Sequence, residues 1–230
     1  MYTLRPSAQR GQAEHGWLSS QHTFSFADYH DPAHMHFRAL RVINEDIIAP
    51  GKGFDTHPHR DMEILTYIIS GELAHKDSMG HGRTIKSGEL QYMSAGTGVN
   101  HSEFNPSQTT PVHLLQIWII PDSKNLPPAY ADWKPLTGQA PLTTLVSPDS
   151  RDSSVSTHRD VSLFLGLMKK GQTLTHNLQQ NRHAWLQMIS GSLNAGGVDL
   201  KPGDGLAITE EKALELQSHE SSSFLLFDLD

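Results

Sequence analysis

The stretch at 56–71, THPHRDMEILTYIISG, combines a pair of histidines with a strongly β-forming run that ends at a turn. His57 and His59 are two residues apart, so in an extended strand both imidazoles point to the same face. Pro58 between them has no backbone N–H to donate, which predicts an edge strand or the start of a strand. Residues 62–69 are rich in β-branched and aromatic residues, which favours a further strand directly after the pair.

Short β-forming runs separated by turn residues continue along the whole chain, while helical periodicity is weak. This pattern predicts an all-β fold, either a sandwich or a barrel. Further strands are expected at 38–49, at 84–93 with a break at Ser87–Gly88, and at 112–120 before Pro121. Two short helices are expected, near 127–133 and near 149–152.

Two landmarks of the first half recur in the second half in the same order. ISGELA at 69–74 matches ISGSLN at 189–194, and KSGEL at 86–90 matches KPGDG at 201–205. Such turns also recur by chance in all-β proteins, but their order and separation favour an internal duplication. A Pro-rich connector at 121–142 separates the halves. We therefore expect two tandem barrels, with domains at 1–125 and 126–230.

The composition, with 37% hydrophobic and 19% charged residues, is that of a folded globular protein. The net charge of −7 and the scattered Lys and Arg disfavour direct nucleic-acid binding, although a protein partner remains possible. The chain has no cysteine, so disulfides and thiolate ligands are excluded. No signal peptide and no membrane-length apolar run are present, which predicts a cytoplasmic protein without membrane association, and we expect a monomer.

The segment GVNHSEFN at 98–105 contributes a second pair of candidate ligands, His101 and Glu103, again two residues apart. Two neighbouring strands that each present such a pair would form a site with three imidazoles and one carboxylate. This donor set suits one divalent transition-metal ion, such as Fe, Ni, Co, Mn, Zn or Cu. In an octahedral ion two positions would stay open, as in a catalytic site. The alternative is that the first pair is an exposed turn and His101 lies in a loop.

The spacing of these residues resembles the two motifs of the cupin superfamily. The first motif is matched by Gly51, His57, His59, Glu63 and Gly71, and the second by Gly88, Gly96, His101 and Asn105. The second motif departs from the pattern, because Ser94 replaces the usual proline and Thr97–Gly98 is an insertion. These departures, together with GWLSSQHTFSFADYHDP near the N-terminus, resemble the pirin family, whose members are bicupins with a metal in the N-terminal barrel.

The resemblance implies that His57, His59, His101 and Glu103 are the metal ligands. By the same resemblance Glu63 is not a ligand, and it either orients a ligand imidazole or is a solvated charge at a strand start. Alignment of Gly71 with Gly191 and of Gly88 with Gly203 places the equivalents of the ligands and of Glu63 at Asn177, Gln179, Leu216 and His183. His176 is one position off and is expected to face away, so the second barrel is expected to be metal-free.

Several pirins cleave flavonols such as quercetin with dioxygen, and the resemblance implies this activity with iron as the first choice of metal. Glu103 would act as general base on the flavonol hydroxyl, and the ring would open with loss of carbon monoxide. The alternatives are a metal-containing transcriptional co-regulator and another cupin enzyme acting on a small metabolite. We expect His75, His81, His113, His158 and His219 at the surface or at strand edges. The aromatics Phe24, Phe26, Tyr67, Tyr92 and Trp118 are expected in the core.

Overall fold

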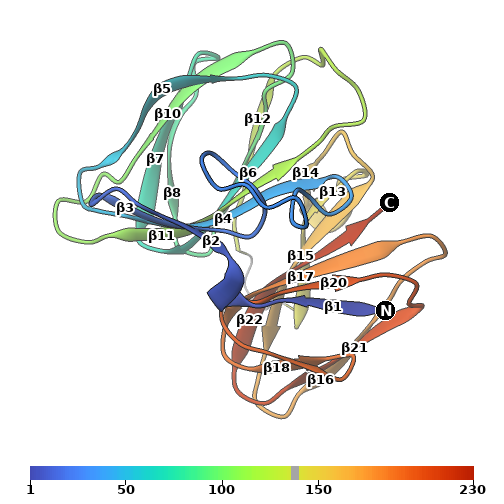
Figure 1. The fold of residues 1–230 in the computed structure, drawn as a ribbon. Helices are drawn as coiled ribbons and strands as arrows, with labels where there is room; N and C mark the ends of the chain where they lie inside the picture. Colours follow the sequence, from blue (N-terminus) through green and yellow to red (C-terminus); the bar gives the residue numbers. More distant parts are fainter. Residues whose placement is uncertain (136–139) are drawn as a thin grey trace. The chain divides into compact units, whose positions relative to one another are not determined.

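The computed structural model describes residues 1–135 and 140–230, and within them nearly all regular structure is β-strand (Figure 1). The helices among these residues are two single turns of 3₁₀ helix, η1 (Ser7–Gln9) and η2 (Arg151–Ser153). The expectation of an all-β fold is confirmed. No helix in the described part of the chain is long and apolar enough to cross a membrane.

The chain forms two compact units whose limits differ from the expected ones. The first unit is Gly11–Pro135, and the second comprises Met1–Arg10 together with Leu136–Asp230. The N-terminal residues join the second unit because Tyr2–Arg5 forms an antiparallel strand pair with Gly205–Ile208. The expected boundary at 125/126 ignored this pairing, which joins residues about two hundred positions apart and leaves no local signal in the sequence.

The helix expected near 127–133 is wrong, because Ala129–Trp133 forms strand β12. It pairs antiparallel with β9 (Leu90–Ser94), from Ala129 opposite Ser94 to Trp133 opposite Leu90. So short a helix would be marginal by itself, whereas pairing with β9 gives alternate residues backbone hydrogen-bond partners. The other expected helix, near 149–152, is the single 3₁₀ turn η2.

The first unit consists of two facing antiparallel sheets. The seven-stranded sheet has the order β12-β9-β6-β11-β4-β3-β2, and the four-stranded sheet has the order β5-β10-β7-β8. The remaining strands of this unit are β2 (Gly11–Glu14), β3 (Leu18–His22), β4 (Leu40–Ile48), β5 (Gly53–His59), β6 (Glu63–Ser70), β7 (Glu72–Asp77), β8 (Gly82–Lys86), β10 (Val99–Phe104) and β11 (Val112–Ile119).

The second unit repeats this arrangement of sheets, except that its edge strand β14 pairs parallel with β13, whereas β2 pairs antiparallel with β3. Its sheets have the orders β1-β20-β17-β22-β15-β13-β14 and β16-β21-β18-β19. Its strands are β1 (Tyr2–Arg5), β13 (Leu142–Ser147), β14 (Val155–Ser156), β15 (Val161–Met168), β16 (Thr173–Asn177), β17 (His183–Ser190), β18 (Leu193–Ala195), β19 (Val198–Leu200), β20 (Gly205–Ile208), β21 (Ala213–Ser218) and β22 (Ser222–Leu229). The expected pair of tandem cupin barrels is therefore confirmed.

The two matched ISG turns have the same backbone conformation. Gly71 and Gly191 have φ of +79° and +78°, a region that other residues rarely adopt. A Cβ on Gly71 would lie 2.7 Å from the Pro111 oxygen, and one on Gly191 would lie 2.3 Å from the Ser221 oxygen. Both turns therefore require glycine for two reasons, which explains why these landmarks recur in the sequence.

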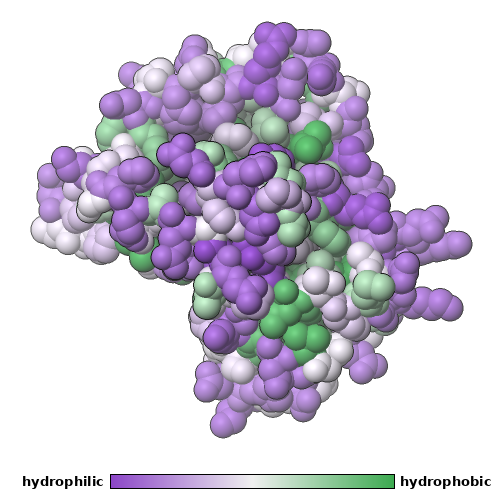
Figure 2. Space-filling model, viewed as in Figure 1, coloured by the Kyte–Doolittle hydropathy of each residue, from purple (hydrophilic) through white to green (hydrophobic). Residues whose placement is uncertain are grey.

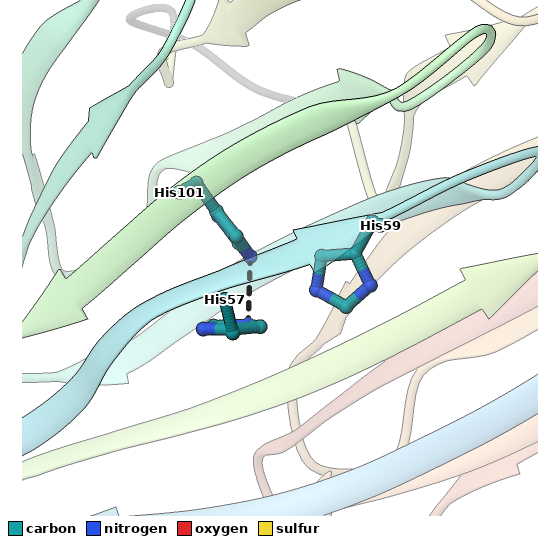
Figure 3. Close-up of side chains that lie close together, drawn as sticks. All are labelled: His57, His59 and His101. Carbon is teal, nitrogen blue, oxygen red and sulfur yellow. Dashed lines mark hydrogen bonds between the residues drawn. The ribbon is translucent and has the colours of Figure 1, made fainter.

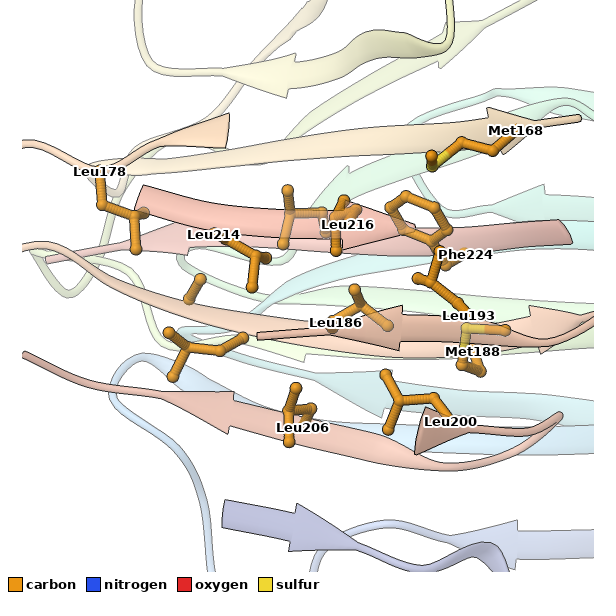
Figure 4. Packing of buried hydrophobic residues seen from close by; sticks show 14 residues of the cluster. Met168, Leu178, Leu186, Met188, Leu193, Leu200, Leu206, Leu214, Leu216 and Phe224 are labelled. Atoms are coloured by element: carbon orange, nitrogen blue, oxygen red, sulfur yellow. The ribbon is translucent and has the colours of Figure 1, made fainter. Parts of the chain in front are cut away.

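The interiors of the two units differ in chemistry. The second unit is filled with leucines and other apolar residues, among them Leu186, Leu206, Leu214 and Leu216 (Figure 4). In the first unit a smaller apolar cluster includes Ile68 and occupies one end of the barrel. The first interior also holds a second small apolar cluster that includes Ile64, together with buried polar residues that form the site described below. The face of the molecule in Figure 2 is mostly hydrophilic, with scattered apolar patches.

Candidate metal centre

Two neighbouring strands of the four-stranded sheet bring three histidines together. β5 is the edge strand, and it pairs with β10 so that His57 lies opposite His101. His59 follows two residues after His57 and points to the same side, as the i, i+2 spacing requires. Figure 3 shows the three imidazoles converging from the two strands.

The nitrogen atoms of these rings are close enough to share one ion. The ring centroids of His57 and His101 are 4.5 Å apart, and those of His59 lie 4.8 Å and 4.9 Å from them. The Nε2 atoms of His57 and His101 face each other at 3.1 Å. One nitrogen from each of the three rings lies within 4.8 Å of the other two. The donor set fits a divalent metal that prefers nitrogen ligands.

The surroundings keep His59 and His101 neutral, which is the form that binds metal. Burial, followed by the charges of His57 and His59, lowers the pKa of His101 to about 3. Burial, followed by the charge of His57, lowers the pKa of His59 to about 4. The Nδ1 of His57 is 2.7 Å from the carbonyl oxygen of Asp55. Because a carbonyl can only accept, Nδ1 carries the proton and Nε2 is free to coordinate.

Glu103 lies two residues after His101 on β10, beyond a register shift in the pairing with β5. Its side chain is buried between the two sheets, with 1% exposed. Gln116 donates to one carboxylate oxygen at 2.9 Å, and Thr66 and Gln91 donate to the other at 3.4 Å and 3.5 Å. Burial raises the pKa of Glu103 to about 7, although these hydrogen bonds oppose the shift. A carboxyl group in this range can exchange a proton near neutral pH.

The carboxylate of Glu103 belongs to a second group of potential ligands that overlaps the first. A ligand atom from each of His75, His101 and Glu103 lies within 4.8 Å of the other two. His101 is thus common to both groups. His75 was expected at the surface or at a strand edge, but its side chain is fully buried. The sequence feature that could have predicted this burial is the alternation in β7, where Leu73, His75 and Asp77 share the buried face.

The structure contradicts both expectations for Glu63. The residue is buried, not solvated, and it accepts a hydrogen bond from the hydroxyl of Tyr92. It lies on the face of β6 opposite to Thr66, whose hydroxyl reaches Glu103. The even offset from His59 did not predict this, because the chain turns between β5 and β6 and Asp61 there has a positive φ of 50°.

A cavity of about 330 Å³ opens beside the histidines. Its lining includes Phe26, Phe54 and Trp118, so Phe26 and Trp118 are not simply core residues as expected. The indole of Trp118 meets the His59 ring edge to face, with 5.0 Å between the ring centroids. Phe26 packs on the same indole at 5.4 Å. The site is therefore bordered by an aromatic wall that suits a flat apolar ligand.

Two buried polar pairs on β3 and β4 also line this cavity. Ser20 donates to Asp46, and the Nδ1 of His22 lies 2.8 Å from the side-chain oxygen of Asn44. Burial raises the pKa of Asp46 to about 6. The cavity thus combines apolar walls with a few polar groups, which is typical of a binding site for a small molecule.

The second unit has two leucines where the first has metal-site histidines. Leu174 of β16 lies opposite Leu216 of β21, as His57 lies opposite His101. By this register His176 corresponds to His59 and faces inward, so the expectation that it faces away is wrong. Its Nε2 lies 3.2 Å from the carboxylate of Asp228, and its ring contacts the ring of Phe164 in the interior of the second unit.

Two matched barrels, one with converging histidines and a buried carboxylate, define a two-domain cupin with a candidate metal centre in its first domain. A family model described as pirin matches residues 3–119, and one described as quercetinase C-terminal cupin domain matches residues 144–229. The chain belongs to the pirin family.

Relatives and solved structures match the chain over its whole length. Quercetin 2,3-dioxygenase of Escherichia coli K12 is 47% identical over 229 residues, covering 100% of this chain and 99% of the relative. A pirin-like protein of Caulobacter vibrioides is 39% identical over 99% of both chains. The crystal structure of the bacterial pirin YhhW from E. coli in complex with nickel(II) superposes with a TM-score of 0.96 at 45% identity, covering 100% of this chain and 99% of that chain.

Proposed function

We propose that this protein is a metal-dependent dioxygenase that cleaves flavonols such as quercetin. In that reaction one flavonol and one dioxygen give a ring-opened ester and carbon monoxide. The observation that carries the proposal is the aromatic-walled cavity lined by His57, His59 and the buried Glu103, with His101 grouped beside the two histidines. The name of the E. coli relative adds support for the substrate class.

The proposed ligands of one divalent transition-metal ion are His57, His59, His101 and Glu103. Neutral imidazoles and one carboxylate suit iron, which we place first, and also nickel, which is present in the E. coli pirin structure. When bound, the ion supplies Lewis-acid and redox chemistry next to the cavity. The three histidines add no negative charge, so an anionic substrate would meet the charge of a single carboxylate ligand.

Glu103 is the proposed general base that accepts the proton of the 3-hydroxyl group. Its carboxylate lines the cavity, within reach of a hydroxyl group bound there, and it is the one carboxylate among the proposed ligands. Gln116 at 2.9 Å and Thr66 at 3.4 Å fix the two oxygens, so the carboxylate cannot rotate freely. The chain thus holds the base in one orientation before substrate arrives.

The cavity walls would hold the flavonol rings and exclude water from the reacting atoms. Phe26, Phe54 and Trp118 offer flat apolar surfaces, against which an aromatic substrate can stack. The polar pairs Ser20–Asp46 and His22–Asn44 offer hydrogen-bonding partners for phenolic hydroxyls. A polyphenol has both kinds of surface, which favours this substrate class over a purely aliphatic metabolite.

The test is oxygen uptake and carbon monoxide release with quercetin, using untagged full-length protein reloaded with iron(II) or nickel(II). The wild-type protein should consume one dioxygen per quercetin and should be inactive on the matching flavone that lacks the 3-hydroxyl. Glu103→Gln should lose more than a hundredfold in turnover, the usual scale for a general base. His57→Ala should lose both metal and turnover.

The matched control is His176→Gln in the second unit, which should keep the wild-type rate. Absence of quercetin turnover in fully metal-loaded wild-type protein would reject the dioxygenase proposal. A wild-type rate in metal-loaded Glu103→Gln would reject the base assignment alone. In the first case, a pull-down that depends on the metal's oxidation state would instead favour the co-regulator alternative.

A further inference from the structure

His75 and Asp77 lie directly behind the candidate metal centre on β7. β7 pairs with β10 so that His75 is opposite Glu103 and Asp77 is opposite His101. The side chains of His75 and Asp77 are both fully buried, with 0% exposed. Buried polar side chains need hydrogen-bond partners, and one partner of this pair is His101.

A chain of hydrogen bonds runs from Asp77 through His75 to His101. The Nε2 of His75 lies 3.3 Å from a carboxylate oxygen of Asp77, and its Nδ1 lies 3.4 Å from the Nδ1 of His101. A carboxylate only accepts, so Nε2 of His75 carries the proton and Nδ1 accepts. The Nδ1 of His101 must then be the donor. Its Nε2, which faces His57, is left with a free lone pair.

Gln91 gives independent support for this arrangement of protons. Its side-chain oxygen accepts from the hydroxyl of Tyr130 at 3.4 Å. Its amide nitrogen faces inward, where it lies 3.5 Å from a carboxylate oxygen of Glu103, which only accepts, and 3.3 Å from the Nδ1 of His75. An amide N–H at that position requires Nδ1 of His75 to be an acceptor, as the Asp77 contact does.

We propose that His75 and Asp77 are positioning residues that hold His101 in the tautomer and orientation needed for metal binding. This inference rests on the metal centre proposed above. His57 has the backbone carbonyl of Asp55 for the same purpose. His101 instead uses a buried histidine and carboxylate from the neighbouring strand. Loss of such an orienting partner typically weakens metal binding by about 10–100-fold.

The bonding of Asp77 makes Asp77→Asn a sharp test of the tautomer. One carboxylate oxygen accepts the backbone N–H groups of Met79 at 2.9 Å and His81 at 3.0 Å. The amide oxygen of asparagine would keep these two bonds, so its NH₂ group would take the other position and face Nε2 of His75. His75 would then carry its proton on Nδ1 and confront the Nδ1–H of His101. The substitution keeps the shape of the side chain at position 77 but moves the proton of His75 from Nε2 to Nδ1.

The substitutions His75→Asn and His75→Leu provide a second pair of nearly equal size. The side-chain oxygen of asparagine takes the position of Nδ1 and can accept from His101, whereas leucine cannot accept. His81→Leu is the control, because His81 binds the same carboxylate at 3.0 Å but is partly exposed and does not contact His101. Each variant retains His57, His59 and His101.

Nickel affinity is measured by chelator competition on untagged full-length protein stripped of metal, together with stoichiometry and X-ray absorption. Asp77→Asn and His75→Leu should raise the dissociation constant at least about tenfold and lower the number of imidazole ligands. His75→Asn should stay within about threefold of the wild type, and so should His81→Leu. Thermal unfolding of the metal-free variants checks that each one is folded. If Asp77→Asn misfolds, the comparison of His75→Asn with His75→Leu provides the test instead.

The inference is wrong if Asp77→Asn and His75→Leu bind nickel like the wild type while His57→Ala loses it. It is also wrong if His75→Asn is as weak as His75→Leu, since the acceptor would then not matter. Loss of a second equivalent of nickel in His75→Leu would make His75 a ligand itself and overturn the positioning role. If His57→Ala also binds like the wild type, the proposed metal centre itself fails.

Discussion

Replacing Glu103 by glutamine should change the stability of the metal-free protein in a strongly pH-dependent way. Burial raises the pKa of this carboxyl group from 4.5 to about 7 in the folded protein. Between these pH values the folded state holds a proton that the unfolded state has already released. The contribution of Glu103 to the free energy of unfolding therefore falls as pH rises through this window and levels off above about pH 7, and the difference between the wild type and Glu103→Gln isolates this contribution from that of the histidines.

The size of the effect follows from the pKa difference. At 1.36 kcal/mol for each pKa unit, the shift from 4.5 to about 7 corresponds to about 3 kcal/mol. Glutamine does not titrate, so Glu103→Gln should become more stable relative to the wild type by about 3 kcal/mol between pH 4.5 and pH 8. The new NH₂ group would face the amide of Gln116, at a cost of about 1–3 kcal/mol that is the same at every pH.

The assay is urea unfolding with a chelator present at several pH values, followed by tryptophan fluorescence. A Trp185→Phe background removes the one tryptophan of the second unit, so the signal comes from Trp17, Trp118 and Trp133. Glu72→Gln, at a half-buried carboxylate where β7 begins, is the control and should show no comparable trend. A difference between Glu103→Gln and wild type that stays constant within about 0.5 kcal/mol from pH 4.5 to 8 would refute the reasoning.

Three further substitutions test other parts of the molecule. Trp118→Leu removes the aromatic wall beside His59 and should raise the KM for quercetin about tenfold in oxygen-uptake assays, with nickel affinity unchanged within threefold. In Gly53→Ala the new Cβ would lie 2.1 Å from the backbone oxygen of Glu103, so β5 should move from β10, lowering both the melting temperature and the nickel bound. His176→Leu should alter thermal stability but leave nickel stoichiometry unchanged, because its partner Asp228 retains its pair with Arg182.

The parts of the site that were predictable from sequence are those fixed by strand periodicity alone. His57 and His59 share a face because they are two residues apart within one strand, and the same parity applies to His101 and Glu103. The duplication was also accessible, because the glycines of the ISG turns occupy positive-φ positions that few other residues tolerate. In each case the physical cause acts over a few residues, so the local sequence contains the signal.

Odd or even spacing did not predict the face of a side chain where the two compared residues are separated by a turn and do not lie in one strand. Glu63 follows His59 by four positions, whereas His183, its equivalent, follows His176 by seven. The odd difference exchanges the two faces of a strand, which is why the alignment assigned the wrong side to His176. When the conformation of a turn is unknown, the spacing across it does not predict which side of the sheet a residue faces, even if the strands on both sides align well.

Contacts between strands of different sequence position were beyond the sequence for a different reason. His75 touches His101 because β7 pairs with β10, and Gln91 reaches His75 from β9 in the opposing sheet. No spacing rule connects these positions, since each pairing depends on the complete barrel. If His75 and Asp77 do orient His101, then the ligand residues are the locally encoded part of the site. The tautomer that lets them bind metal is set by tertiary structure, so substitutions on β7 should alter metal affinity without touching a ligand.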